Sequence, residues 1–299
     1  MKLHALFFAV LFILIPLSSF AESAADGITK PFTRIISLYP AHTENLVRMG
    51  ALKELIGVGT EDDYPPEIQG RPRFSYHEDA EKFIAAKPDL VLVRPMIERS
   101  HPQLVAKLRA AHITVISLQP HGMAGLFKYW QELGKLSGHV KESRKMILDF
   151  ENEILRLQQE IASWQESHNL LQPKVYFEVM HSKSRTIAAG SIAAYVLKEA
   201  GGINIARDAK QVRTTNIAFY PTEKLLSKGS KIDIFIAQQG RMNAVNREII
   251  EQEPGYNAIR AVREGKIYLV PEELVSRPTM RILEGISTIA RILYPGIKL

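Results

Sequence analysis

The stretch that organises this chain runs from Lys141 to His168, reads KESRKMILDFENEILRLQQEIASWQESH, and contains neither Gly nor Pro. Its apolar residues recur in alternating steps of three and four, at Ile147, Phe150, Ile154, Leu157, Ile161 and Trp164. This spacing predicts one continuous helix, about 40 Å long, which is longer than a helix must be to cover one small sheet. We therefore expect residues 141–170 to form a rigid bridge between two parts of the chain.

The same helix allows a second interpretation, the seam of a coiled-coil dimer. However, the repeat lasts barely four heptads, and apolar residues also lie outside the seam. The bridge within a monomer is therefore the favoured interpretation.

On both sides of the bridge, short apolar runs alternate with helical patterns. Before it, the strand-like runs are 35–38, 55–58, 90–93 and 113–116, and the helical patterns are 43–49, 80–86, 103–111 and 126–136. After it, the strand-like runs are 175–179, 232–237 and 266–270, with helices at 192–200 and from near Pro278. This alternation predicts an α/β protein with mostly parallel sheets. We expect two α/β lobes, at 22–140 and 171–299.

Composition narrows the class of protein. The chain has 299 residues, 46% hydrophobic and 23% charged, which is typical of a globular protein. Its formal net charge of +6 is too small to indicate nucleic-acid binding. There is no cysteine, which excludes disulfides, thiol catalysis and Cys-based zinc sites, and leaves His, Tyr and carboxylates as the strong metal ligands.

The first 21 residues have the pattern of a cleavable secretory signal. Lys2 precedes an apolar run at 5–17, and small residues precede a cleavage point after Ala21. A membrane anchor is the alternative, but the run is shorter than the roughly 20 residues that span a bilayer, and Pro16 interrupts it. Because no cysteine is present to carry a lipid, we expect a protein that diffuses freely in the periplasm.

Several motifs, in order along the chain, carry a resemblance to a known family. They are RIISLYPAHTENL at 34–46, Gly57-Val58, DYPP at 63–66, AEKFIAAKPDLV at 80–91, AGGIN at 200–204 and SRP at 276–278. Together they resemble the periplasmic substrate-binding proteins of ABC importers for cobalamin and ferric siderophores. The resemblance implies the class III fold, two α/β lobes bridged by one long helix. It also implies capture of a metal chelate between the lobes, delivery to an inner-membrane permease, no catalysis and no resident cofactor.

The resemblance further implies two permease-docking residues. In this family one glutamate of each lobe docks into an arginine pocket of a permease subunit, and the matching positions are Glu81 and Glu223. The alternative is that each residue only suits the positive end of a helix dipole, a gain of about 0.3 to 1 kcal/mol.

Candidate ligand-binding residues follow from the topology, because ligands of open parallel sheets sit at the carboxyl ends of strands. Tyr39 and His42 follow the first strand, so we expect them to face the cleft between the lobes. His181 holds the corresponding place in the second lobe. These three residues are the candidate metal ligands, and packing or hydrogen bonding is the alternative role for each histidine.

Arginines and aromatic residues complete the predicted site. Six arginines lie in or near loops at this edge, namely Arg94, Arg99, Arg185, Arg213, Arg241 and Arg277. Guanidinium groups bind carboxylate and catecholate oxygens in pairs, so converging arginines would favour an anionic chelate, with a solvated surface as the alternative. The expected aromatic contacts are Tyr39, Tyr76, Phe219 and Tyr220, and the loop 238–243 adds Gln239 and Met242. Trp130 and Trp164 fit apolar helix faces instead, which weakens a corrinoid ligand, since cobalamin-binding members place tryptophan in the cleft.

We rank the candidate functions by the support that the sequence gives to each. A ferric siderophore receptor comes first, then a cobalamin or corrinoid receptor, then a binder of haem or of a bare metal ion. A chelatase-like enzyme on a similar fold, and a sensor or adhesion protein, come last. No Gly-x-Ser-x-Gly, His-Glu-x-x-His or phosphate-binding glycine loop supports an enzyme.

Overall fold

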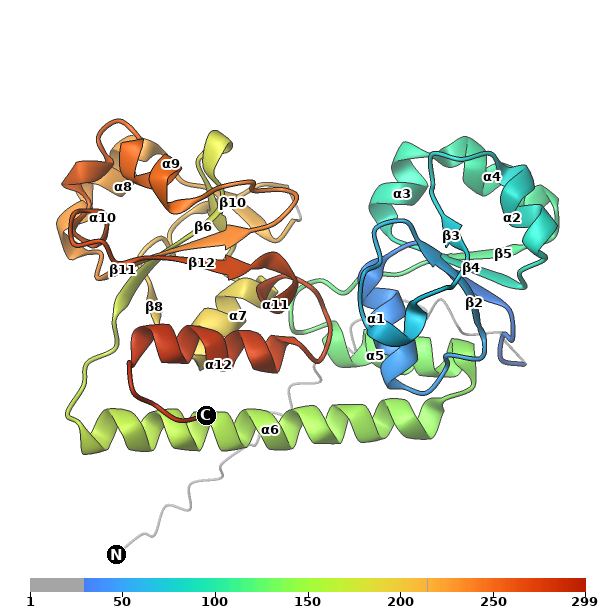
Figure 1. Ribbon diagram of the computed structural model, residues 1–299, viewed down its shortest axis with the longest axis horizontal. Coiled ribbons are helices and arrows are strands. Elements are labelled where there is room, and N and C mark those ends of the chain that lie inside the picture. The colour runs from blue at the N-terminus through green and yellow to red at the C-terminus, as the bar shows by residue number, and fades with distance from the viewer. Residues whose placement is uncertain (1–29, 214) are drawn as a thin grey trace, which may run out of the picture.

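The computed structural model describes residues 30–213 and 215–299. The predicted signal peptide, residues 1–21, lies outside this part of the chain. Within these ranges no helix combines the length and the apolar composition that crossing a membrane requires. The described chain forms two lobes that lie side by side above one long helix (Figure 1).

The N-terminal lobe is built on a five-stranded, fully parallel sheet in the order β3-β2-β1-β4-β5. Its strands are β1 (Ile35–Ser37), β2 (Leu55–Gly59), β3 (Arg73–Phe74), β4 (Leu90–Val93) and β5 (Thr114–Ser117). Every residue of β1 and β4 is buried, as expected for central strands covered on both faces. The helices are α1 (Pro40–Arg48), α2 (Ala80–Ala86), α3 (Pro95–Ser100), α4 (Pro102–Ala110) and α5 (Leu126–Ser137), with a 3₁₀ turn at Pro66–Ile68.

The C-terminal lobe has a seven-stranded mixed sheet in the order β12-β11-β6-β7-β10-β9, with β8 beside β6. Its strands are β6 (Lys174–Met180), β7 (Arg185–Ile187), β8 (Ile203–Asn204), β9 (Lys210–Gln211), β10 (Ile217–Phe219), β11 (Ile234–Gln239) and β12 (Ile267–Pro271). Its helices are α7 (Ile192–Glu199), α8 (Thr222–Ser227), α9 (Arg247–Gln252), α10 (Arg260–Arg263), α11 (Glu272–Val275) and α12 (Ile282–Leu293), with 3₁₀ turns at His181–Lys183, Gly229–Lys231 and Tyr256–Ala258.

This sheet differs from the expected one on one side. Strands β7, β10 and β9 follow β6 as antiparallel neighbours, and the sequence pattern did not predict them. They are only two or three residues long, which is too short for a period of two to be recognised. The α/β class and the two-lobed organisation are confirmed.

The predicted bridge is confirmed as helix α6, Val140–Ser167. Its apolar stripe, which includes Phe150 and Leu157, packs on α5 of the first lobe and on α7 and α12 of the second. The stripe belongs to one apolar cluster that continues from Ile35 in β1 to Leu293 in α12. Because this face packs inside the chain, it is not available as the seam of a coiled coil. One core therefore joins both lobes, which lie along the same helix (Figure 1).

A second contact joins the two lobes, between the segment before α12 and two residues of the N-terminal lobe. The carbonyl oxygen of Pro278, in the segment before α12, accepts a hydrogen bond from Asn45 Nδ2 at 2.9 Å and another from Trp130 Nε1 at 3.1 Å. Both donors are buried residues of the N-terminal lobe. In this region the sequence predicts a helix that starts near Pro278, but α12 starts at Ile282. The Pro278 carbonyl oxygen accepts hydrogen bonds from the other lobe instead of from the backbone of a helix.

We predict that Asn45→Asp, which keeps the shape of the side chain, lowers the free energy of unfolding by about 1 to 3 kcal/mol. The reason is that a carboxylate oxygen would face the Pro278 carbonyl where an amide donor now lies. Urea unfolding followed by circular dichroism measures the loss. Asn169→Asp, at an exposed position after α6, is the matched control. Equal stability of the two variants would contradict this role of Asn45.

Candidate functional site

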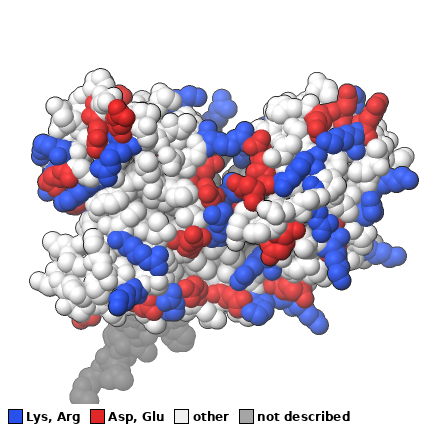
Figure 2. Space-filling view, in the orientation of Figure 1, with Lys and Arg blue, Asp and Glu red and all other residues white. Residues whose placement is uncertain are grey.

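A cleft of about 550 Å³ separates the two lobes. Its N-terminal wall is formed by residues that follow β1, β2 and β4, and its C-terminal wall by residues that follow β11 and β12 together with residues 187–193 and 215–217. The carboxyl ends of parallel strands from both sheets therefore meet at the cleft, as the topology predicts. Figure 2 shows charged side chains of both signs gathered where the two lobes face each other.

Five of the predicted ligand-binding residues line this cleft, namely Tyr39, Tyr76, Arg94, Arg241 and Arg277. Met242, which the sequence placed in the same polar loop, lines it too. The remaining predicted residues are not among the lining side chains, namely His42, Arg99, His181, Arg185, Arg213, Phe219, Tyr220 and Gln239. The two tryptophans, Trp130 and Trp164, are also absent from the lining.

His42 does not face the cleft, contrary to the sequence-based expectation. Its imidazole is fully buried beneath α1, where Nδ1 lies 2.7 Å from the Tyr129 hydroxyl and Nε2 lies 3.1 Å from the Val93 carbonyl oxygen. Burial lowers the pKa of His42 to about 4, so the ring stays neutral. Both nitrogens are engaged, which is the packing role that the sequence left as the alternative.

His181 is likewise engaged outside the cleft. Its Nδ1 lies 3.0 Å from a Glu178 carboxylate oxygen, and its Nε2 lies 3.2 Å from a Glu253 carboxylate oxygen. The Glu178 contact, reinforced by Glu253, raises the pKa of His181 despite its partial burial. The two carboxylates favour the protonated imidazole, which would form ion pairs with both of them within the lobe.

Four of the other predicted residues outside the cleft have local partners. Tyr220 is almost fully buried in the second core cluster of the C-terminal lobe. The guanidinium of Arg185 lies over the Phe219 ring, 5.0 Å from its centroid, where β7 and β10 pair. Gln239 donates to the Val245 carbonyl oxygen at 2.9 Å. The unexpected antiparallel strands, which redirect the chain after β6, account for most of these differences.

The arginines that do line the cleft have unequal surroundings. Arg277 donates to Glu44 Oε1 at 2.9 Å and lies 4.0 Å from Asp63, and Arg241 pairs across the cleft with Glu61 of the other lobe. Arg94 lies over the Tyr39 ring, 5.0 Å from its centroid, and pairs with no carboxylate in the described ranges. Arg94 is therefore the cleft arginine whose charge no side chain of the described chain neutralises.

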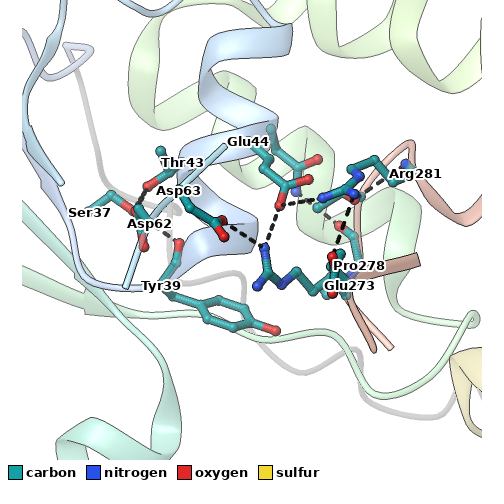
Figure 3. A network of polar contacts seen from close by, with 12 residues as sticks. Ser37, Tyr39, Thr43, Glu44, Asp62, Asp63, Glu273, Pro278 and Arg281 are labelled. Atoms are coloured by element: carbon teal, nitrogen blue, oxygen red, sulfur yellow. Dashed lines mark hydrogen bonds and ion pairs between the residues drawn. The ribbon is translucent and has the colours of Figure 1, made fainter. Parts of the chain in front are cut away.

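Glu44 anchors a network of charges at the junction of the lobes (Figure 3). This α1 carboxylate is almost fully buried, and Arg281 lies 3.9 Å from the same oxygen that Arg277 contacts. Burial raises the pKa of Glu44, and the Arg277 guanidinium offsets part of that effect. Arg277 is thus positioned by a residue of the opposite lobe.

The polar lining residues that the sequence analysis did not name include Glu61, Asp62 and Glu272, and Gln238 lies in the loop 238–243 that it selected. Asp62 accepts a hydrogen bond from Thr43, and burial raises its pKa to about 6. One polar atom each of Asp62, Gln238 and Glu272 is buried without a hydrogen-bond partner. The signal was available for two of these positions, since Glu61 and Asp62 follow the predicted strand 55–58, whose carboxyl end had to lie at the same edge.

Glu81 and Glu223 occupy corresponding places in the two lobes. Each is exposed in the first turn of a helix, α2 and α8 respectively. Both helices lie on the face of the molecule opposite α6 (Figure 1). Neither carboxylate forms a hydrogen bond or ion pair within residues 30–213 and 215–299.

We predict that the contribution of His181 to stability depends on pH. Because its folded-state pKa is raised, the contribution is complete below the unfolded pKa of 6.5 and is lost as the pH rises through the folded value. Hydrogen bonds to a charged group contribute about 1.5 to 3 kcal/mol. The difference in unfolding free energy between the wild type and His181→Gln is therefore expected to be larger at pH 6 than at pH 9.

The control is His112→Gln, at an exposed imidazole without a polar contact in the described ranges. Urea unfolding at both pH values measures each difference. A His181→Gln effect of the same size at both pH values would show that the ring acts only by packing.

Comparison with known proteins agrees with this architecture. The family model described as periplasmic binding protein matches residues 35–274. An uncharacterized ABC transporter substrate-binding lipoprotein, YvrC of Bacillus subtilis, is 24% identical over 270 residues, which cover 90% of this chain and 82% of that protein. A vitamin B12-binding protein of Pectobacterium carotovorum is 25% identical over 179 residues, 59% of this chain and 62% of that protein.

Among solved structures, the crystal structure of a possible iron-binding, periplasmic solute-binding protein from Staphylococcus epidermidis aligns with a TM-score of 0.75 at 25% identity. The alignment covers 89% of this chain and all of that one. The match of the family model, which extends over both lobes and the bridge, shows that the chain belongs to the periplasmic binding protein family, whose members serve ABC transporters as substrate-binding components.

Proposed function

We propose that this protein binds a metal chelate in the cleft between its lobes and delivers it to the permease of an ABC importer. The observation that carries the proposal is the cleft itself, formed by the strand ends of two lobes that α6 and the Pro278 junction hold together. The protein acts by binding and release, without catalysis, in the periplasm. Cell fractionation with a lipid label distinguishes a freely diffusing protein from a lipoprotein. The Bacillus relative is named a lipoprotein.

The charges of the cleft favour a chelate of low net charge. Of the six arginines that were expected to converge, three line the cleft. Two of these, Arg241 and Arg277, pair with Glu61 and Glu44, so Arg94 alone lacks a carboxylate partner among the described residues. A ferric ion held by three hydroxamates forms a neutral complex, whereas three catecholates leave a highly negative one. A ferric siderophore of the hydroxamate type is therefore our first candidate, with Arg94 donating to an oxygen of the chelate.

A corrinoid is the second candidate, supported by the names of the Pectobacterium relatives. The absence of Trp130 and Trp164 from the lining weighs against it. Haem is the third, because the Tyr39 ring lines the cleft and its hydroxyl has no hydrogen-bond partner within the described ranges. A bare ion has less support, since no group of three His, Cys, Asp or Glu in those ranges suits a metal.

A thermal-shift panel tests the ligand class, with a ferric hydroxamate, a ferric catecholate, cobalamin, cobinamide and haemin. A ligand at 100 times its Kd adds about 2.7 kcal/mol to the stability of the folded state. We expect the ferric hydroxamate to raise the Tm and the catecholate complex to have a smaller effect. A rise with cobalamin or haemin alone would replace the siderophore, and no rise with any chelate would contradict the proposed function.

The same assay examines Arg94 in the cleft. Arg94→Gln is expected to weaken binding of the active chelate about tenfold or more, because a charge-assisted hydrogen bond contributes about 1.5 to 3 kcal/mol. Arg99→Gln, an exposed arginine outside the lining, is the control. Equal affinity of both variants would remove Arg94 from the binding site.

We further propose that Glu81 and Glu223 dock the loaded protein on the permease. Their unpaired, exposed carboxylates on corresponding helices of one face support this role. Glu81→Gln with Glu223→Gln is expected to reduce uptake by cells at least tenfold and to leave chelate affinity unchanged, because such charges set orientation and association rate.

The matched control replaces two exposed glutamates of α6, Glu151 and Glu166, by Gln. Uptake assays with labelled chelate compare the two double variants. If affinity falls together with uptake, or if both double variants behave alike, the docking assignment is wrong.

A further inference from the structure

Two histidines of the N-terminal lobe face each other outside the cleft. His77 lies three residues before α2, and His101 lies between α3 and α4. His77 Nδ1 and His101 Nε2 are 3.3 Å apart. A cavity of about 240 Å³ adjoins both rings. Neither residue is used by the chelate site or by the proposed docking pair.

We propose that His77 and His101 together bind one divalent first-row transition-metal ion, of the class Zn²⁺, Ni²⁺ or Cu²⁺. Two imidazole nitrogens that each lie about 2.0–2.1 Å from a tetrahedral zinc ion are about 3.3–3.4 Å apart. The observed separation of the two nitrogens matches the length of this edge, and each ring has to rotate so that its lone pair turns from the N···N line toward the ion. Imidazole nitrogen is a preferred ligand of these ions and a poor one for Mg²⁺ or Ca²⁺.

The protonation of His101 suits this role. The Ser100 hydroxyl donates to the Met96 carbonyl oxygen at 2.8 Å, so it accepts the hydrogen bond from His101 Nδ1, also at 2.8 Å. The proton of the neutral ring is then on Nδ1, and the lone pair of Nε2 points at His77. Such a partner on the second nitrogen fixes the tautomer and ring orientation of metal-binding histidines.

His77 supplies the second lone pair by a change of tautomer. Without metal, its Nδ1–H donates to His101 Nε2. Its Nε2 has no hydrogen-bond partner in the described part of the chain, so the proton can move there through water and leave Nδ1 free. This change moves a proton within the His77 ring and leaves the number of protons on the pair the same.

Packing keeps the two rings close together before any ion arrives. The Tyr76 ring packs on both imidazoles, with centroids 4.5 Å from His77 and 4.9 Å from His101. Charges around the cavity are balanced, because Lys107 pairs with Asp79 and Lys82 pairs with Glu78. A bound dication therefore meets no excess of positive charge.

The site keeps open coordination positions. No third His, Cys, Asp or Glu of residues 30–213 and 215–299 completes a set with the two histidines. Water from the adjoining cavity fills the remaining positions. His77 is exposed and lies three residues before α2, the helix that carries Glu81, so the proposed site is on the surface near that helix.

Zinc titration by calorimetry tests the proposal, using protein that was stripped with a chelator and carries no polyhistidine tag. One equivalent is expected to bind, and His77→Gln and His101→Gln are each expected to weaken binding at least tenfold. His112→Gln, the exposed histidine described above, is expected to bind zinc as the wild type does. Mg²⁺ is expected not to bind.

X-ray absorption of the zinc-loaded wild type provides a readout that does not depend on a variant. We expect two imidazole nitrogens at about 2.0–2.1 Å, with oxygen ligands completing the shell. No zinc binding, a spectrum without imidazole, or equal affinity of all three variants would overturn the site. Because both histidines lie outside the cleft lining, the result holds whether or not a chelate binds there.

Discussion

The carbonyl oxygen of Pro278 is the acceptor on which the relation between the two lobes depends. It belongs to the C-terminal lobe, yet both of its donors, Asn45 and Trp130, belong to the other. Both hydrogen bonds therefore cross from one lobe to the other. Separating the lobes here would leave the buried carbonyl oxygen without its donors, which carries the cost of an unsatisfied polar group. Together with α6 and the core that continues through both lobes, this contact joins the two walls of the cleft.

The sequence predicts the fold well because the fold depends on long-range patterns. The repeat at Ile147, Phe150 and Ile154 predicts a bridge at 141–170, one residue from the observed start of α6 and three from its observed end, and alternating strands and helices predict parallel sheets. The short strands β7, β9 and β10 escape prediction because their pairing depends on neighbours from elsewhere in the chain.

The site is predicted only in part for a related reason. Tyr39 and Arg94 directly follow central strands, so topology alone brings them to the cleft. His42 comes one helical turn later, where the direction of the side chain depends on packing under α1 against Tyr129, which is distant in sequence. The partners of Arg277 and Arg241 lie in the opposite lobe, so the neutralisation of their charges is visible only in three dimensions.

That neutralisation also determines how the empty receptor interacts with salt. A cleft lined by unpaired arginines would gather small anions from solution, and an arriving ligand would have to displace them. Here the counterions of Arg241 and Arg277 are the protein's own carboxylates. The Arg277–Glu44 pair is largely buried, so salt screens it little, whereas the exposed Arg241–Glu61 pair remains sensitive to salt. Changing salt therefore acts on the Arg241–Glu61 pair before it acts on the Arg277–Glu44 pair that joins the two lobes.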